Sequence, residues 1–249
     1  TKTVTGETSG LESGKTFPIT VNCGTDGPNG VYNVADGQTE TITVLAGTTC
    51  TVTEGVRPEL KDASFAWGQV TYQNRERTTT EPIEVYVGQT SETVTVTNPI
   101  NRVTAAVSLV KELDDSFNVL AADRKYQGTW SCTYGNQVVA SGNWGPVVAG
   151  VSVELANNVP LTAVCTATET DPGAPVAGDP SYVWAPGNPT VTSATVVAGG
   201  TAEVVVTNKV LHQTGTITVQ KTIDGDGYAG TQDDKDFTMI LTCTRPGDP

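Results

Sequence analysis

The segment Cys50-Thr-Val-Thr-Glu54 recurs further along the chain as Cys165-Thr-Ala-Thr-Glu169. In both copies polar and less polar residues alternate, and a period of two is typical of a β-strand with one face toward the core. The cysteine, the middle apolar residue and the glutamate share one face of this strand. The segment therefore predicts a β-rich fold in which a carboxyl group points to the same side as the core residues.

The residues around this segment form a tandem repeat. Equivalent lysines, first cysteines and Thr-Asn pairs recur every 109 to 111 residues, as shown by Lys2, Lys111 and Lys221, by Cys23, Cys132 and Cys243, and by Asn98 and Asn208. The spacing predicts repeat 1 at residues 1–101, repeat 2 at residues 102–211, and the start of a truncated third repeat at residues 212–249. We expect this last piece to be frayed or completed by another chain, because it lacks the second cysteine, the glutamate and the asparagine.

Alternation of Val, Ile and Thr with polar residues dominates the rest of the chain, and no helical period persists. The predicted strands are Phe17–Cys23, Glu40–Val44, Thr49–Glu54, Thr90–Asn98, Val107–Leu113, Ser152–Leu155, Thr162–Glu169, Ala202–Asn208 and Thr216–Ile223. Several short strands in each unit of about 110 residues predict an all-β fold of tandem immunoglobulin-like antiparallel β-sandwiches.

Composition argues against several functions. The formal net charge of −13 disfavours binding to nucleic acid. No apolar run is long enough for a membrane span. One histidine and isolated cysteines predict neither a metal site nor a cofactor, and no catalytic triad or phosphate-binding loop indicates an enzyme with an external substrate. The acidic stretch Asp224–Asp236 resembles a calcium loop only loosely, and we expect a solvated hairpin loop there.

The cysteines pair by equivalence between the repeats. Two cysteines occur at corresponding positions in each complete repeat, which predicts the disulfides Cys23–Cys50 and Cys132–Cys165. Such bonds indicate an oxidising, extracellular location. Cys243 has no counterpart within residues 212–249, so its partner is expected outside this sequence.

A lysine, a glutamate and an asparagine in each repeat lie on the apolar side of their predicted strands. The two sets are Lys2, Glu54 and Asn98, and Lys111, Glu169 and Asn208. Burial favours a neutral amine and a neutral carboxyl group, so lysine becomes a nucleophile and glutamate an acid/base catalyst. The predicted product is an intramolecular Lys–Asn isopeptide bond formed with loss of ammonia. Two other interpretations stay open: a buried salt bridge with asparagine capping the strand end, or side chains at sheet margins that reach water.

These motifs resemble a known family. A lysine in the first strand, segments such as Glu54-Gly-Val-Arg-Pro58 and Glu169-Thr-Asp-Pro172, and a terminal Val-Thr-Asn are similar to the B-type repeats of collagen-adhesin stalks and Gram-positive pilins. The cysteine pair looks more like an actinobacterial surface-repeat family of unknown function. The resemblance implies a transthyretin-like sandwich, with lysine and asparagine joined across the first and last strands and glutamate as the catalyst.

The resemblance also implies a structural stalk or filament of a secreted bacterial cell-surface protein. Its expected partners are neighbouring repeats of the same polypeptide, other surface-fibre subunits or a host ligand. The alternative is an adhesive module that binds a host glycan or protein. Adhesion predicts an exposed aromatic or apolar patch in the region of Trp130 and Trp144, which only the second repeat contains, whereas a stalk predicts equivalent surfaces on the two repeats.

Overall fold

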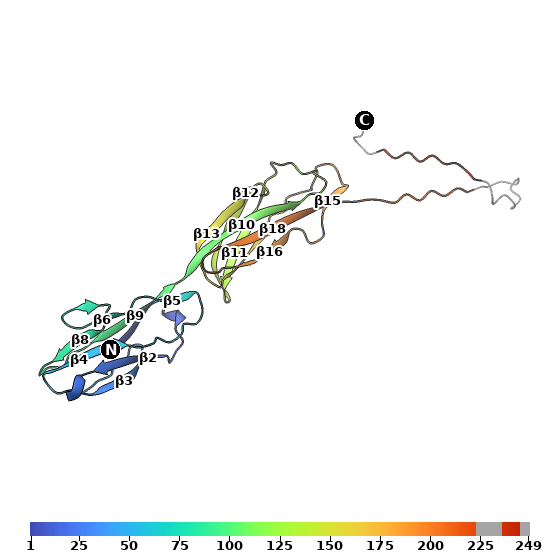
Figure 1. Ribbon diagram of the computed structural model, residues 1–249. Coiled ribbons are helices and arrows are strands. Elements are labelled where there is room, and N and C mark those ends of the chain that lie inside the picture. The colour runs from blue at the N-terminus through green and yellow to red at the C-terminus, as the bar shows by residue number, and fades with distance from the viewer. Residues whose placement is uncertain (223–235, 245–249) are drawn as a thin grey trace. The chain divides into compact units, whose positions relative to one another are not determined.

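The computed structural model describes residues 1–222 and 236–244 (Figure 1). Residues 1–212 form one compact unit, and the described residues that follow belong to a second unit. Strands dominate the first unit, and its two short 3-10 helices are η1 (Thr8–Gly10) and η2 (Gly24–Asp26). This confirms the all-β fold class. No helix among the described residues is long and apolar enough to cross a membrane.

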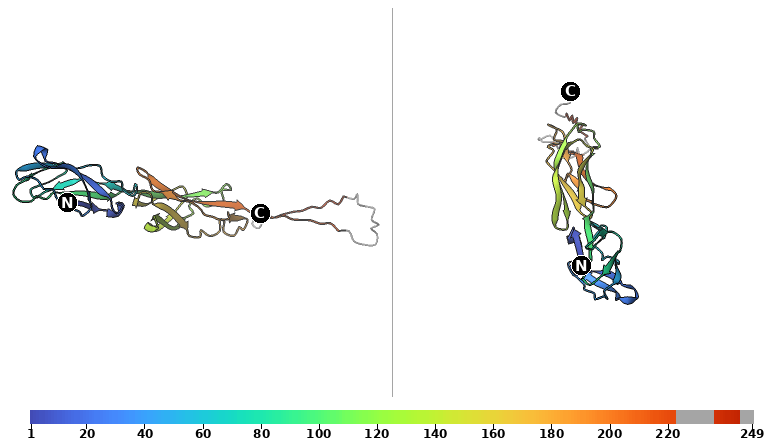
Figure 2. Two further views of the ribbon diagram at one scale, coloured as in Figure 1. Left: turned by 90° about the horizontal axis from the view of Figure 1, so that it is seen from below. Right: turned by 90° about the vertical axis from the view of Figure 1, so that its left-hand side faces the viewer.

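Repeat 1 is built from two sheets whose inner faces share one core, and Figures 1 and 2 show the two layers. The first sheet has the order β1 (Lys2–Gly6), β9 (Thr95–Arg102), β6 (Thr71–Gln73) and β7 (Thr78–Thr79), and β5 (Phe65–Trp67) also pairs with β9. The second sheet has the order β3 (Asn29–Ala35), β2 (Thr16–Asn22), β4 (Thr48–Glu54) and β8 (Ile83–Val87).

Repeat 2 follows the same plan with longer strands. Its first sheet has the order β13 (Ser152–Pro160), β10 (Thr104–Asp114), β18 (Thr201–His212) and β15 (Tyr182–Trp184), and β16 (Thr190–Thr192) also pairs with β18. Its second sheet has the order β12 (Gln137–Val147), β11 (Tyr126–Tyr134), β14 (Val164–Glu169) and β17 (Ala194–Thr195).

In both repeats the first and last strands are parallel neighbours. Lys2 of β1 lies opposite Val96 of β9, and Lys111 of β10 lies opposite Val206 of β18. Asn98 and Asn208 are each two residues beyond these partners. Since residues two apart on a strand share a face, lysine and asparagine are diagonal neighbours on the core side.

Two predicted strands of repeat 1 are wrong in whole or in part. Residues 38–47 form no strand, and the predicted strand Thr90–Asn98 begins only at Thr95. In repeat 2 the corresponding segments pair with residues 104–110 of β10. A strand forms only where a neighbouring backbone completes its hydrogen bonds, so alternation in the sequence was insufficient here.

The prediction of a strand at residues 216–223 is also wrong over the described part. Residues 213–222 are extended and exposed but form no strand, and Figure 2 draws them without an arrow. Lys221 Nζ lies 5.0 Å from the centroid of the Phe237 ring. Most of the predicted acidic loop lies outside the described residues.

One residue of repeat 2 contacts repeat 1 through several groups. The Tyr134 hydroxyl donates a hydrogen bond to the Asp62 carboxylate and accepts one from Ser64 Oγ at 3.2 Å. Its ring packs edge-on against Phe65, and the Arg102 guanidinium carbon lies 4.4 Å from its centroid. These contacts link the end of β11 to the segment that leads into β5.

Candidate functional site

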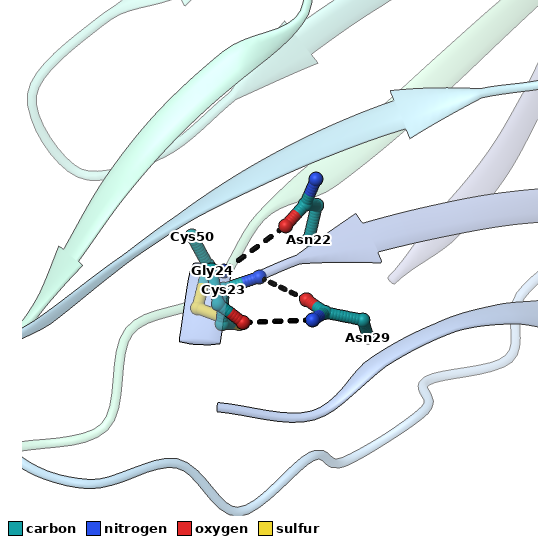
Figure 3. Close-up of a disulfide and its surroundings, with 5 residues drawn as sticks. All are labelled: Asn22, Cys23, Gly24, Asn29 and Cys50. Carbon is teal, nitrogen blue, oxygen red and sulfur yellow. Dashed lines mark hydrogen bonds between the residues drawn. A yellow bond between two sulfur atoms is a disulfide. The ribbon is translucent and has the colours of Figure 1, made fainter. Parts of the chain in front are cut away.

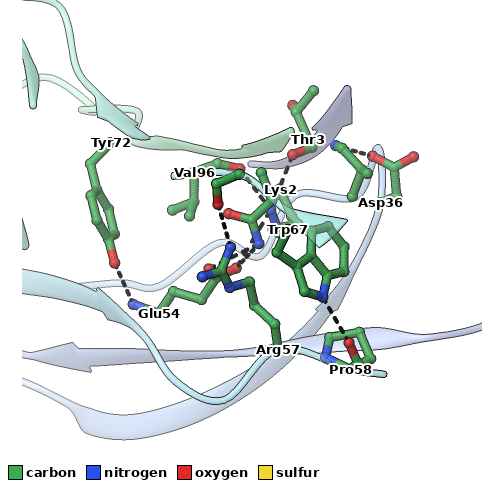
Figure 4. Close-up of polar contacts among 12 residues, drawn as sticks. Lys2, Thr3, Asp36, Glu54, Arg57, Pro58, Trp67, Tyr72 and Val96 are labelled. Atoms are coloured by element: carbon green, nitrogen blue, oxygen red, sulfur yellow. Dashed lines mark hydrogen bonds and ion pairs between the residues drawn. The ribbon is translucent and has the colours of Figure 1, made fainter. Parts of the chain in front are cut away.

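In repeat 1, strands from both sheets bring Lys2, Glu54 and Asn98 together in the core (Figure 4). Lys2 Nζ lies 3.5 Å from Glu54 Oε1, and Asn98 Nδ2 donates to Glu54 Oε1 at 2.8 Å and to Oε2 at 2.9 Å. The lysine and asparagine are fully buried, and the glutamate side chain is 2% exposed. The carboxyl group therefore contacts both the amine and the amide away from water.

Repeat 2 assembles the same cluster. Lys111 Nζ lies 3.4 Å from Glu169 Oε2, and Asn208 Nδ2 donates to Glu169 Oε1 at 2.8 Å. All three side chains are fully buried. Two clusters with the same contacts, built from sequences that differ at most other positions, indicate that the arrangement is a property of the repeat.

Each lysine is held by backbone carbonyls and an aromatic ring. Lys2 Nζ donates to Thr3 O at 3.0 Å and to Val96 O at 3.2 Å, and it lies 4.3 Å from the centroid of the Phe17 ring. These two hydrogen bonds hold the amine beside Glu54 Oε1. Burial lowers the pKa of Lys2 to about 8, although the nearby Glu54 carboxylate opposes the shift.

Lys111 has equivalent surroundings. Its Nζ donates to Glu112 O at 2.9 Å and to Val206 O at 3.1 Å, and the Tyr126 ring centroid lies 4.7 Å away. Burial lowers the pKa of Lys111 as well, against the opposing effect of Glu169. Phe17 and Tyr126 are 109 residues apart (126−17), so the repeat period contained a signal for this ring that the sequence prediction overlooked.

The asparagine carbonyl is poised for a proton donor. Asn98 Oδ1 and Asn208 Oδ1 are both buried and have no hydrogen-bond partner among the described residues. A buried acceptor without a partner costs roughly 1–3 kcal/mol. A protonated glutamate could donate to this oxygen after rotation of the amide, because a neutral carboxyl group carries one donor. The cluster is therefore suited to polarising the amide toward attack by an amine.

An arginine and a tryptophan lie beside each cluster, and the sequence prediction missed this pairing. In repeat 1, Trp67 Nε1 donates to Pro58 O at 2.9 Å, and Arg57 donates to Gly68 O at 2.7 Å with its guanidinium carbon 5.7 Å from the Trp67 ring (Figure 4). Trp67 also packs edge-on against Phe17, with the ring centroids 5.6 Å apart.

The corresponding pair in repeat 2 comes from different sequence positions. Trp184 Nε1 donates to Gly173 O at 2.6 Å, and the Arg124 guanidinium carbon lies 5.3 Å from the Trp184 ring. Arg124 precedes β11, whereas Arg57 follows β4. Since the two arginines are not equivalent in the repeat alignment, no periodic signal could have identified them.

Both cysteine pairs lie on paired strands of the second sheet or directly beside them. Cys23 Sγ is bonded to Cys50 Sγ, and Cys132 Sγ is bonded to Cys165 Sγ. Figure 3 shows how Asn29 supports the first bond, since its Oδ1 accepts from Cys23 N at 2.7 Å and its Nδ2 donates to Gly24 O at 2.7 Å. Cys243 is exposed and unpaired with any described cysteine.

The two tryptophans named by the adhesive alternative do not lie on the surface of the second repeat. Trp130 is 7% exposed and Trp144 is 2% exposed, and both belong to the core. Trp144 Nε1 donates to Thr168 O at 3.1 Å, which fixes the strand that carries Glu169. Among the described residues, no group of three or more His, Cys, Asp or Glu side chains could hold a metal ion.

Comparison with known proteins gives a family for both repeats. The model of the family described as Domain of unknown function (DUF5979) matches residues 1–101 and 107–210. No curated protein matches the sequence.

Among solved structures, the chain is similar to the C-terminal fragment of the pilus adhesin SpaC from Lactobacillus rhamnosus GG, with 12% identity, a TM-score of 0.39, and coverage of 86% of this chain and 98% of that one. It is also similar to the major pilin from Streptococcus pyogenes, with 12% identity, a TM-score of 0.36, and coverage of 84% and 96%. The expected membership in a repeat family of unknown function is confirmed by the family match, and the chain belongs to the DUF5979 family, with one matched segment in each repeat.

Proposed function

We propose that the chain is a structural segment of a bacterial cell-surface stalk or fibre, in which each repeat carries a disulfide and a Lys–Asn isopeptide bond. The observation that carries the proposal is the buried Lys–Glu–Asn cluster, which recurs with the same contacts in both repeats. Disulfides persist in oxidising compartments, which supports a location outside the cytoplasm. Residues 1–101 and 102–211 serve as the two complete domains, and residues 212–249 begin a third.

The chemistry is a single transfer inside each repeat. The neutral Lys2 amine attacks Cγ of Asn98, and Glu54 takes the proton that the amine releases and supplies one to the departing amide nitrogen. One C–N bond forms, one C–N bond breaks, and Asn98 Nδ2 leaves as ammonia. Lys111, Glu169 and Asn208 carry out the same step in repeat 2. Exclusion of water protects the reacting amide from hydrolysis.

The position of the bond explains a mechanical role. It would join β1 to β9 near the points where the chain enters and leaves repeat 1, and β10 to β18 likewise in repeat 2. A pulling force would then pass from Lys2 directly to Asn98, without loading the residues between them. Forced unfolding depends on the barrier to strand separation, and a covalent bond between the two terminal strands removes that route.

Intact mass spectrometry of the reduced chain tests the proposal. Each isopeptide bond removes one ammonia, about 17 Da, so two bonds lower the mass by about 34 Da. After proteolysis, tandem spectra should contain a branched peptide that joins Lys2 to Asn98 and another that joins Lys111 to Asn208. A mass equal to that of the sequence would contradict the proposal.

Glutamate variants assign the catalyst. Glu54→Ala should abolish the loss of ammonia in repeat 1 only, and Glu169→Ala should abolish it in repeat 2 only. Glu84→Ala is a matched control, because Glu84 lies on the exposed face of β8 and should leave both bonds intact. Loss of both bonds in a single variant would contradict independent reactions in the two repeats.

A further inference from the structure

The loop that follows the glutamate of each cluster is held by the indole of a tryptophan. Trp67 Nε1 donates to Pro58 O at 2.9 Å, and Trp184 Nε1 donates to Gly173 O at 2.6 Å. Both acceptors lie four residues beyond the glutamate of their repeat (58−54 and 173−169). The same kind of donor therefore reaches the same point of the loop in both repeats.

In repeat 1 the tryptophan also belongs to a strand that pairs with the strand of the asparagine. Trp67 on β5 lies opposite Ile100 of β9, which is two residues beyond Asn98. The next residue continues the contact, because Gly68 N donates to Pro99 O at 2.8 Å. Figure 4 shows the indole beside the cluster, with its hydrogen bond directed away to the loop after the glutamate.

Repeat 2 has the same connection. Trp184 on β15 lies opposite Val210 of β18, two residues beyond Asn208. Ala185 N donates to Lys209 O at 2.9 Å, directly after the asparagine. Each tryptophan is therefore fixed by backbone pairing to the asparagine strand and by its side chain to the glutamate loop.

This connection crosses from one sheet of the sandwich to the other. The glutamate strands β4 and β14 belong to the second sheet of their repeats, and the asparagine strands β9 and β18 belong to the first sheet. Backbone hydrogen bonds align strands within a sheet, whereas side chains set the contact between two sheets. The indole hydrogen bond is thus a link between the sheets close to the point where carboxyl group and amide meet.

An arginine lies against each indole and adds a second link to the same loop. Arg57 lies in the loop of repeat 1 and donates to Gly68 O, directly after Trp67. Arg124 donates to the carbonyl oxygens of residues 172–175, which follow Glu169. The two arginines come from unrelated positions, but both hold the loop that leaves the glutamate strand.

We propose that Trp67 and Trp184 are positioning residues of the two clusters, which hold the glutamate loop against the asparagine strand. The inference rests on the isopeptide chemistry proposed above. Neither indole takes part in the reaction. Each keeps the carboxyl group within reach of the amide, and a displacement of about 1 Å from a reactive geometry can slow a reaction by about a hundredfold.

The same link keeps water away from the amide. Water that enters between the loop and the asparagine strand can attack Cγ of the asparagine in place of the lysine amine. A C–O bond then forms, the C–N bond breaks, ammonia leaves and the residue becomes aspartate. Loosening the loop should therefore both slow the cross-link and divert part of the chain to this hydrolysis product.

Phenylalanine variants of the full chain test the proposal, because they remove the N–H group and keep an aromatic ring. The chain is made by cell-free synthesis under oxidising conditions, sampled over time, digested and weighed. Trp67→Phe should slow formation of the branched peptide of repeat 1 by roughly ten- to a hundredfold and leave repeat 2 unchanged. Trp184→Phe should do the reverse. Uncross-linked peptides of the affected repeat should gain about 1 Da as asparagine is hydrolysed.

Two measurements separate positioning from a general loss of structure. The Cys132–Cys165 disulfide in the same samples reports how much of repeat 2 has folded, so the rate can be given per folded molecule. Trp130→Phe is the matched control, because it makes the same change in the same core, on β11, and should leave this rate unchanged. Arg124→Gln weakens the second link and should slow repeat 2 with the indole intact.

The outcomes distinguish this inference from the function on which it rests. If the unmodified chain loses ammonia and Trp184→Phe reacts at the same rate per folded molecule, the positioning role is overturned and the isopeptide chemistry stands. Equal slowing by Trp130→Phe and Trp184→Phe would also overturn it, since the effect would then be one of core packing. If the unmodified chain loses no ammonia, both fail.

Discussion

Replacing Glu54 by glutamine in a chain that cannot form the isopeptide bond tests the electrostatics of the cluster. Asn98→Ala removes the electrophile and leaves Lys2 and Glu54 in place, so the comparison is between Asn98→Ala alone and Asn98→Ala with Glu54→Gln. Removing one member of a buried ion pair generally costs about 3–5 kcal/mol, because the other charge is left without compensation. The pKa of Lys2 predicts a smaller cost here.

The magnitude follows from the pKa of about 8. At pH 7 the folded chain can release the Lys2 proton at a cost of roughly 1 kcal/mol, since one pKa unit corresponds to a little over 1 kcal/mol. If the carboxylate charge of Glu54 is removed, Lys2 can lose its proton rather than stay charged without a partner. The loss of folding free energy through Lys2 is therefore limited to the cost of releasing that proton. Below pH 8 Lys2 is charged and benefits from Glu54, whereas above pH 8 it is neutral. The cost of Glu54→Gln through Lys2 should be at most roughly 1 kcal/mol at pH 7, at most roughly 3 kcal/mol at pH 6, and close to zero at pH 9.

Urea unfolding followed by brief proteolysis and peptide mass spectrometry measures this cost for each repeat separately. Peptides from β9 report repeat 1, and peptides from β18 report repeat 2. Repeat 2 is the internal control and should not change. A cost that is the same at pH 6 and pH 9, or that increases with pH, would refute the assignment of a weakly held proton to Lys2.

Other perturbations test the surroundings of the site. Isopeptide formation in repeat 1, followed as loss of mass after refolding, should accelerate between pH 6 and pH 8. Burial lowers the pKa of Lys2 to about 8, and the neutral amine is the nucleophile. A rate independent of pH would contradict this. Cys23→Ser with Cys50→Ser opens a loop with a sequence separation of 27 and should destabilise repeat 1 by about 3–4 kcal/mol in urea unfolding, with repeat 2 unchanged. Tyr134→Phe removes the hydroxyl that is hydrogen-bonded to Asp62 and Ser64, and it should lower local stability by about 1–3 kcal/mol. The loss should appear as faster hydrogen exchange at residues 62–65. Unchanged exchange there would exclude a stabilising role for the hydroxyl.

Much of the cluster could be predicted because it depends on strand parity and on the repeat. Lysine, glutamate and asparagine each share a face with apolar neighbours, and the repeat period gives every one of them a counterpart. Residues two apart on a strand always share a face, so the direction of these side chains follows from local geometry. The sequence could not show which strands are neighbours, and the 3.5 Å separation of Lys2 Nζ and Glu54 Oε1 depends on that pairing.

Other features depended on contacts between distant segments. The alternating residues 40–44 predict a strand that does not form, whereas the corresponding residues of repeat 2 form β13 and pair with β10. Arg57 and Arg124 reach similar tryptophans from unrelated positions, which no periodic pattern encodes.

The sequence by itself determined the all-β class, the repeat period and the inward direction of Lys2, Glu54 and Asn98, because each follows from alternation along a single strand. Only the tertiary structure decided that β1 lies parallel to β9 and that the carboxyl group contacts both amine and amide. The physical reason is that side-chain direction is set within a few residues, whereas strand pairing and burial are set by hydrogen bonds and packing between segments almost a hundred residues apart.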